Sequence, residues 1–342
     1  MRISPENMQK KLHELFLAYG FTHDKAKLLA NIFTESTLDG VSSHGINRVP
    51  RFIEHIKKGV ININAEAEKI NSFGNIERWD GNFGPGPVNA TICANKAIAL
   101  AKQHGMGMVA LRNTNHWMRG GTYGKQAAES GCISILFTNT QANMPPWGGK
   151  ESRIGNNPFV VAIPRKNGNV ILDMAISQFS FGKINDYKLK GEQLPFYGGW
   201  DNKHQLSKDP EKILKKERGL PIGYWKGSAL SMILDMLATI LSAGNSTSNI
   251  SKKEIETGIS QVYICIYPNV FNDNGLQETL LQEIIDFTKN VESINPEDRI
   301  FYPVRNKCQF SWYCDGKADN MYNEQSLNTA KSVATIVLTD FA

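Results

Sequence analysis

Apolar residues in the first sixty positions recur every three to four residues, which is the period of an amphipathic α-helix. The sequence Ser4-Pro5-Glu6 predicts the start of a first helix, because a serine cap followed by a proline in the first turn is typical of a helix N-terminus. A second helix is predicted after Thr22-His23-Asp24, and a third after Ser42-Ser43-His44-Gly45. The chain is therefore expected to begin with a helical segment.

From about residue 67 the pattern changes to alternating helices and strands. An alanine-rich amphipathic helix is predicted over residues 88–104, and the apolar run MVALRN after it predicts a strand. The remaining predicted helices cover residues 121–130, 227–244 and 276–292, and the remaining predicted strands cover residues 132–140, 158–164, 169–175 and 261–268. Such alternation predicts an α/β or α+β fold.

Two further features concern the connections. The strands over residues 158–164 and 169–175 are expected to pair across a Lys-Asn-Gly turn. The helix over residues 227–244 is expected to end at Gly244. Residues 183–220 are polar and interrupted by Gly and Pro, which predicts a long excursion over the surface.

Composition and charge exclude several classes of protein. The chain has 342 residues, and its 38 Lys and Arg against 33 Asp and Glu give a formal charge of +5. Its basic residues are scattered among acidic ones, so the charge pattern is not that of a nucleic-acid binder. No run of about 18 apolar residues predicts a membrane span, and the N-terminus lacks the unbroken apolar stretch of a signal peptide.

The cysteines are odd in number and widely spread; they are Cys93, Cys132, Cys265, Cys308 and Cys314. Three of them lie in apolar or helical patterns and are expected to be buried thiols in a reducing compartment. No CxxC pair or close Cys/His spacing indicates zinc, so no metal site is predicted. We expect a cytoplasmic protein.

One segment matches the residue pattern of a dinucleotide-binding motif but lies between the wrong secondary-structure elements. Residues 105–110 read GMGMVA, which fits GxGxxA, but a predicted helix precedes the string and a predicted strand follows it. The Rossmann fingerprint requires the reverse order. A dinucleotide, if bound, must therefore be held by another architecture.

The first candidate cluster is Ser43-His44-Gly45-Ile46-Asn47-Arg48. If Gly45 begins a helix, His44 and Arg48 stand four residues apart, close to one helix face. A histidine can exchange a proton near neutral pH, and an arginine offers a planar fork for a carboxylate. The alternative is a helix cap beside a solvated arginine.

A second cluster, Arg112 to Gly121, places His116 after a predicted buried strand, where α/β proteins often have their sites. The alternative is a polar turn with a hydrogen-bonded core histidine. Asp173 lies inside the apolar strand VILDMA, where a buried carboxylate needs hydrogen-bond partners or a functional role; the alternative is that it caps the next helix. A third region, Thr138 to Pro158, is rich in Gly and Pro around Trp147, which predicts a loop of fixed path.

Several of these strings occur together in one order: SHGINR, LRNTNHWMRGGTYG, MPPWGGKESRIGNNPFVVAIP, ILDMA and GYWKGSALSMILDMLATILS. In that order they resemble the malate/L-lactate dehydrogenase family of NAD(P)-dependent reductases, over about residues 1–303. The resemblance implies a family-specific, non-Rossmann α/β fold with an N-terminal helical segment and a mixed sheet. It also implies a homodimer and a small keto-acid substrate derived from a sugar, with malate, lactate, ureidoglycolate or a cyclic imine as alternatives.

The resemblance also implies roles for individual residues. His44 would donate a proton with Ser43 as its polar neighbour, Arg48 would hold the substrate carboxylate, and His116 and Asp173 would line the pocket. The cofactor, NAD(H) with NADPH as the alternative, would lie on two segments. These comprise Asn169, Val170, Ile171, Leu172, Asp173, Met174 and Ala175, and further along Trp225 and Lys226.

Three regions follow from this comparison. Residues 1–65 with the C-terminal part would form a helical region for dimerisation and substrate binding, and residues 66–300 an α/β region for cofactor and substrate. Residues 304–342 depart from the family, where Gly and an acidic residue would follow Pro303 and help to hold the cofactor. We interpret them as a frameshifted tail. An alternative function is therefore a binding protein whose catalysis the tail impairs.

Overall fold

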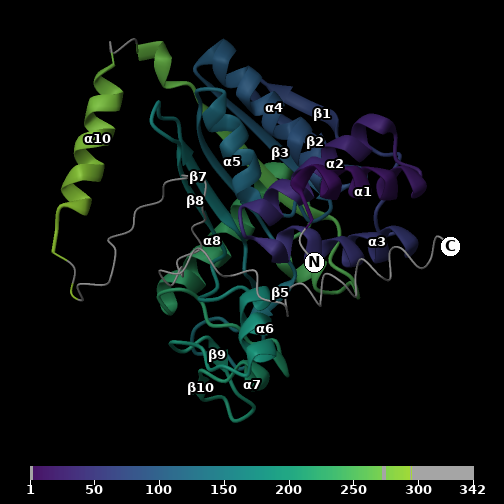
Figure 1. The fold of residues 1–342 in the computed structure, drawn as a ribbon, viewed down its shortest axis with the longest axis vertical. Helices are drawn as coiled ribbons and strands as arrows, with labels where there is room; N and C mark the ends of the chain where they lie inside the picture. The colour runs from purple at the N-terminus through teal and green to yellow at the C-terminus, as the bar shows by residue number, and fades with distance from the viewer. Residues whose placement is uncertain (1–2, 272–274, 293, 295–342) are drawn as a thin grey trace.

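The computed structural model describes residues 3–271, 275–292 and 294 (Figure 1). Three helices form the N-terminal segment, as predicted: α1 (Pro5–Ala18), α2 (His23–Leu38) and α3 (Val49–Lys57). The Ser4 hydroxyl caps α1 by accepting a hydrogen bond from the Asn7 N–H at 3.2 Å. Phe16, Phe33 and Phe52 pack together at the centre of this segment with ring centroids 5.5–5.9 Å apart.

The central element is a seven-stranded sheet with the order β1-β2-β3-β11-β4-β7-β8. Its strands are β1 (Glu68–Phe73), β2 (Ile76–Asp80), β3 (Met106–Thr114), β4 (Ile133–Thr138), β7 (Phe159–Ile163), β8 (Val170–Met174) and β11 (Ile259–Ile266). Only β2 and β3 run parallel, and every other neighbouring pair is antiparallel. The predicted α/β fold with a mixed sheet is confirmed, and β7 and β8 form the predicted hairpin.

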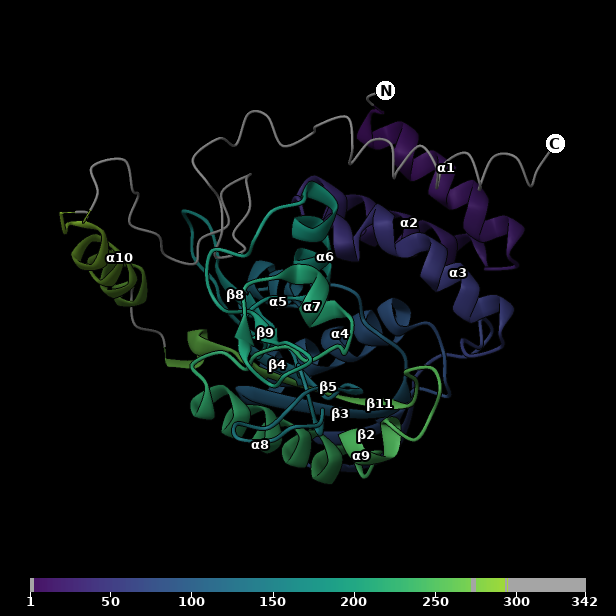
Figure 2. The same cartoon turned by 90° about the horizontal axis from the view of Figure 1, so that it is seen from below.

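Helices cover both faces of the sheet. Helices α4 (Gly86–His104) and α5 (Gly120–Glu129) lie on one face, and α8 (Trp225–Ser242) lies along the other (Figure 2). Side chains alternate along β3 accordingly: Val109 and Leu111 pack under α4 and α5, whereas Met108 and Ala110 pack with α8. Cys93, Cys132 and Cys265 are buried free thiols, as predicted. Helix α8 ends at Ser242, two residues before the predicted glycine, because Ala243 adopts the left-handed cap.

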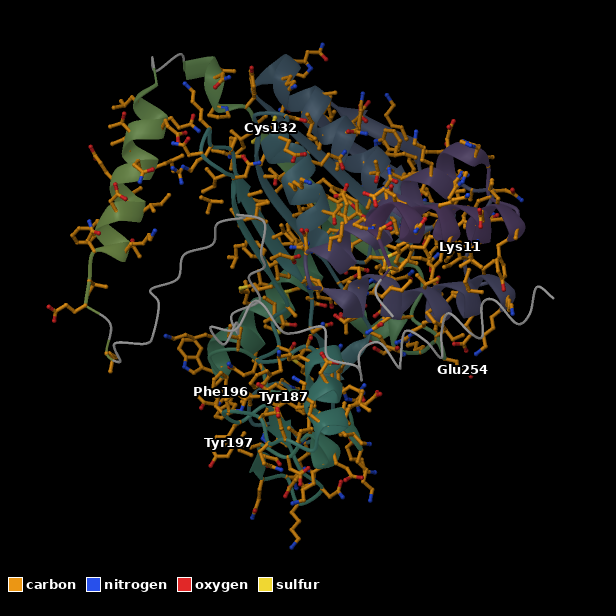
Figure 3. All side chains as sticks on the ribbon, in the orientation of Figure 1. Lys11, Cys132, Tyr187, Phe196, Tyr197 and Glu254 are labelled. Atoms are coloured by element: carbon orange, nitrogen blue, oxygen red, sulfur yellow. The ribbon has the colours of Figure 1, made fainter. Side chains whose placement is uncertain are left out.

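Residues 177–222 contain a small lobe that extends away from the sheet (Figure 1). It comprises α6 (Phe181–Lys190), β9 (Gly199–Trp200), β10 (Leu206–Ser207) and α7 (Pro210–Leu214). Phe179, Ile184, Leu194 and Ile213 form its own buried cluster, and Tyr187, Phe196 and Tyr197 lie on it (Figure 3). The predicted surface excursion is thus a folded lobe, because four separated apolar residues suffice for a local core.

The remaining elements are short or peripheral: β5 (Ala142–Met144), β6 (Ile154–Gly155), α9 (Thr247–Ile250) and α10 (Leu276–Lys289). Helix α10 stands on the side of the molecule opposite the N-terminal helices (Figures 1 and 2). Arg165 ties it to the β7–β8 turn through Glu278 at 3.3 Å and Gln282 at 2.7 Å. In the described ranges no helix is long and apolar enough to cross a membrane. Residues 304–342 lie outside the described part of the chain.

Candidate active site

The backbone around His44 is held by the end of α2. Residues Ser42–His44 and Ile46–Arg48 form two 3-10 turns, and α3 begins only at Val49. The condition that a helix begins at Gly45 is met only by a 3-10 turn, whereas the third predicted helix is present as α3. Thr37 explains the difference, because its hydroxyl accepts a hydrogen bond from the Ile46 N–H at 2.8 Å and donates one to Phe33. This interaction fixes the break between the two turns.

Gly45 is required at this break because no space remains for a side chain. A Cβ atom there would lie 2.7 Å from the backbone nitrogen of Thr37, closer than real Cβ atoms approach. The turn that carries His44 is consequently pressed against α2. The position of the imidazole is set by this close backbone packing.

His44 and His116 lie together, although they come from distant segments. Their rings stack with centroids 5.6 Å apart and an interplanar angle of 28°. Ser43 Oγ lies 3.1 Å from Nδ1 of His44, and Nδ1 of His116 accepts a hydrogen bond from the Met118 N–H at 2.9 Å. A neutral His116 therefore carries its proton on Nε2. Among the described residues, no hydrogen bond is formed to the Nε2 atom of either ring, so both atoms are accessible to a ligand.

The two imidazoles are neutral at pH 7 in the unliganded protein. Burial lowers the pKa of His44 to about 4, with the positive charges of Arg48 and Arg119 acting in the same direction. Burial lowers the pKa of His116 well below its usual range, and Arg48 adds to this effect. The pKa of Arg48 is itself lowered to about 10 by burial and by Arg51, against an opposing effect of Glu256.

Asp173 lies on β8 and faces the N-terminus of α5. Its Oδ2 atom accepts a hydrogen bond from the Gly121 N–H at 2.8 Å and lies 3.7 Å from Nε of Arg119. Burial raises the pKa of this carboxyl, while Arg119 and the Gly121 N–H oppose the shift. A Cβ on Gly121 would lie 2.7 Å from Oδ2, so the helix approaches the carboxylate only through a glycine. Asp173 thus caps α5, which precedes it in the chain. The alternative that Asp173 caps the next helix is wrong, because that helix, α6, is capped by Ser180.

The Gly- and Pro-rich region around Trp147 anchors α8. Buried Asn157 accepts a hydrogen bond from the Thr140 N–H at 2.9 Å and donates one to the Ser231 carbonyl on α8 at 2.8 Å. The Trp147 N–H donates to Ser228 Oγ at 3.0 Å. This region acts on the site indirectly, by holding the start of α8 in place.

The site has the features of an enzyme that handles a small anion: two neutral imidazoles, a cation and a buried carboxylate. Comparison with known proteins agrees. A family model for malate/L-lactate dehydrogenase matches residues 3–310. The chain belongs to the malate/L-lactate dehydrogenase family. Members of this family are NAD(P)-dependent oxidoreductases, and this chain is a dehydrogenase or reductase of that kind.

Individual members are similar over nearly the whole chain. The 2,3-diketo-L-gulonate reductase of Citrobacter koseri is 43% identical over 304 residues, which are 89% of this chain and 91% of that protein. The sulfolactate dehydrogenase of Methanocaldococcus jannaschii is 28% identical with a TM-score of 0.81, over 98% of this chain and 97% of that one. The malate dehydrogenase of Entamoeba histolytica shares the fold with a TM-score of 0.87 at 24% identity, over 98% of both chains.

The two segments predicted to hold the cofactor of this dehydrogenase are neighbours. Past β8, the Ile176 carbonyl accepts from the Ile222 N–H at 2.8 Å, and the Gln178 N–H donates to the Leu220 carbonyl at 2.7 Å. These bonds bring the end of β8 beside the chain that leads into α8. At the start of α8, Trp225 is 61% exposed, and Nζ of Lys226 lies 5.9 Å from the centroid of its ring as a cation–π contact. An exposed ring, a cation and a helix N-terminus fit a nucleotide diphosphate.

Asn169, the first residue of the predicted cofactor segment, has a local structural contact. Its side-chain oxygen accepts a hydrogen bond from the Arg165 N–H at 3.1 Å and so closes the β7–β8 turn. The small lobe approaches the site from another direction. A Cβ on Gly182 of α6 would lie 2.9 Å from Cβ of Ser43. The lobe therefore covers the residue beside His44.

The sequence assigned no role to Thr37, Arg119 or Asp39. Thr37 is recognisable only through its contact with Gly45, and Arg119 only through carboxylates from two distant segments. Neither contact leaves a local pattern in the sequence, because the partners are separated by other elements of the fold.

Proposed function

We propose that this dehydrogenase reduces 2,3-diketo-L-gulonate to 3-dehydro-L-gulonate with NADH, and that His44 donates the proton. The observation that carries this proposal is a partly buried Arg48 that forms no ion pair among the described residues, in a site with two neutral imidazoles. A desolvated cation without a partner favours an anionic ligand. The substrate is suggested by the 43% identical reductases that carry this name.

Arg48 would bind the carboxylate that a 2-keto acid carries next to its carbonyl group. The planar guanidinium can hold a carboxylate through two parallel hydrogen bonds, which fixes the orientation of the substrate. The Nε2 proton of His116 would donate to a substrate oxygen, since Nδ1 is occupied by the Met118 N–H. Together these contacts would place the carbonyl oxygen near His44.

His44 would act as the general acid. Its pKa of about 4 in the unliganded protein results from burial and from two arginine charges. A bound carboxylate offsets the charge of Arg48, which raises the pKa of His44 and lets it take up a proton. Nε2 can then protonate the forming alkoxide while Ser43 holds Nδ1. A positioned acid of this kind contributes about 10²- to 10⁴-fold in rate.

When bound, the nicotinamide supplies the hydride for the carbonyl carbon. Residues 169–175, Trp225 and Lys226 would hold the cofactor. Asp173 binds the start of α5 and would line the pocket beside the cofactor. NADPH is the alternative cofactor.

We also propose that the chain is a homodimer, formed through the exposed face of α8. Six large apolar side chains on this helix are 36–71% exposed; they are Leu230, Met232, Ile233, Met236, Leu237 and Ile240. A helix that is apolar on all sides is normally covered. A cytoplasmic location is a prediction that rests on the sequence.

The test is oxidation of NADH, and separately of NADPH, by the purified chain with 2,3-diketo-L-gulonate, pyruvate or oxaloacetate. Turnover with the diketo acid and NADH alone supports the proposal. Turnover only with pyruvate or oxaloacetate would support the proposed mechanism but show that the substrate is a different keto acid. No turnover by a folded chain that still binds NADH favours the alternative, a binding protein impaired by residues 304–342. Replacing this tail by one that contains the family Gly and acidic residue would then restore activity.

A further inference from the structure

Arg119 lies between two carboxylates that come from different parts of the fold. One of its terminal nitrogens donates to Oδ2 of Asp39, the residue that ends α2, and its Nε lies 3.7 Å from Oδ2 of Asp173 on β8. The three side chains are only 15%, 19% and 23% exposed for Arg119, Asp39 and Asp173, respectively. Water therefore screens this bridge much less than a surface ion pair.

The bridge is connected to the elements that carry His44, His116 and Asp173. Asp39 ends the helix whose Thr37 holds the turn of His44, and Asp173 accepts from Gly121 at the start of α5. Arg119 immediately follows Met118, whose N–H fixes the tautomer of His116. Arg119 thus joins the helical segment that carries His44 to the sheet that carries Asp173.

We propose that Arg119 is a positioning residue of the active site: it forms an ion pair with Asp173 and adds positive charge beside His44, and Asp39 balances that charge. The inference deepens the proposed function, on which its activity measurement rests. Arg119 acts through its two carboxylates and through its field at His44, without being assigned a contact with the substrate.

The charged groups around each member give the proposal a signed prediction. His44 is surrounded by Ser43, His116 and the cations Arg48 and Arg119, whereas Asp173 has Arg119 and the Gly121 N–H. Removing the Arg119 charge therefore raises the pKa of both His44 and Asp173. Neutralising Asp39 leaves the Arg119 charge unbalanced and lowers both. If the bridge only stabilised the fold, the two substitutions would not be expected to shift the pKa of His44 in opposite directions.

The experiment compares Arg119→Met, Arg119→Lys and Asp39→Asn in the full-length chain without substrate. The pKa of His44 is measured by NMR from the imidazole nitrogens. We expect an upward shift of less than about one unit in Arg119→Met, because burial and Arg48 lower this pKa more than Arg119 does. We expect a downward shift in Asp39→Asn and little change in Arg119→Lys, which keeps the charge. His55 serves as the internal reference, because burial, Arg51, Arg48, Glu54 and Lys58 shift its pKa rather than Arg119 or His44.

The pH profile of kcat/KM, measured with whichever keto acid is reduced, should move in the same directions. Shifts of the same sign in Arg119→Met and Asp39→Asn, or no shift with only a lower Tm, would overturn the proposal. If Arg119→Met does not fold, the other two variants still test the proposal. The proposal fails if Arg119→Lys changes the pKa of His44, or if Asp39→Asn does not lower the pKa of His44. If the wild-type chain reduces no keto acid, the proposed function fails, and the NMR titration still tests Arg119 separately.

Discussion

The imidazole rings of His44 and His116 stack 5.6 Å apart, between a turn at the end of α2 and a turn that follows β3. Each ring has its Nδ1 atom occupied, by Ser43 Oγ and by the Met118 N–H, respectively. The pair therefore offers two Nε2 atoms, although each imidazole is held by a different segment of the chain. This relationship separates the roles of the two histidines and leads to the first prediction.

His44→Asn should lower kcat by about a hundredfold or more, because the variant has no general acid. NADH binding should be unchanged, since the residues proposed to hold the cofactor are intact. Steady-state rates and a fluorescence titration with NADH measure the two quantities. His116→Asn is the matched comparison, and it should chiefly raise KM. Wild-type turnover in His44→Asn would show that another group is the acid.

Binding of an anionic keto-acid analogue should be accompanied by proton uptake. In the unliganded protein His44 has a pKa of about 4 and is neutral at pH 7. A carboxylate at Arg48 raises this pKa, so binding takes up protons and weakens as the pH rises. Calorimetry of oxamate binding to the NADH-loaded chain, in two buffers of different ionisation enthalpy, measures the uptake. His44→Asn should take up fewer protons, and proton release by the wild type would contradict the prediction.

The same pKa predicts how acid affects stability. The pKa of His44 is about 6.5 in the unfolded chain and about 4 in the folded one, so between these values the unfolded chain binds more protons. The free energy of unfolding therefore falls as the pH decreases from 6.5 to 4, and His44 contributes about 3 kcal/mol to this loss. Urea unfolding at several pH values should show a smaller loss for His44→Asn. Equal losses in both chains would contradict the lowered pKa.

Gly45→Ala should destabilise the chain by about 1 to 3 kcal/mol and lower kcat, because the new Cβ displaces the turn that carries His44 from α2. The matched variants are Thr37→Ala and the double substitution. If the contact with Thr37 is the cause, the double variant loses less stability than the sum of the two single variants. Strictly additive losses would mean that the clash is relieved elsewhere.

Ile240→Lys should convert the proposed dimer into monomers, because a lysine within a covered apolar face leaves a buried charge without a partner. Ile240 on α8 is 71% exposed in the single chain. Leu189→Lys is the control, since Leu189 is similarly exposed, at 64%, but lies on α6 in the small lobe. Sedimentation of the three chains measures the assembly. A dimer that survives Ile240→Lys would place the interface elsewhere.

The sequence by itself determined the elements that depend on near neighbours. Ser4 and Pro5 start α1, the Lys-Asn-Gly turn joins β7 to β8, and three of the cysteines are buried thiols as their apolar surroundings predict. These features follow from local periodicity, capping and turn chemistry, each of which acts over a few residues. The family motifs likewise named the residues of the candidate site.

The tertiary structure decided what distant residues impose on one another. Two short 3-10 turns stand where a helix was expected to start at Gly45, because the Thr37 hydroxyl accepts a hydrogen bond from the Ile46 N–H. Arg119 meets Asp39 and Asp173 only after the helical segment packs on the sheet. A contact between residues far apart in the chain produces no periodic pattern in the sequence, and it contributes free energy only in the folded state. The sequence could therefore name the candidate site residues of this dehydrogenase. It could not name the residues that position them.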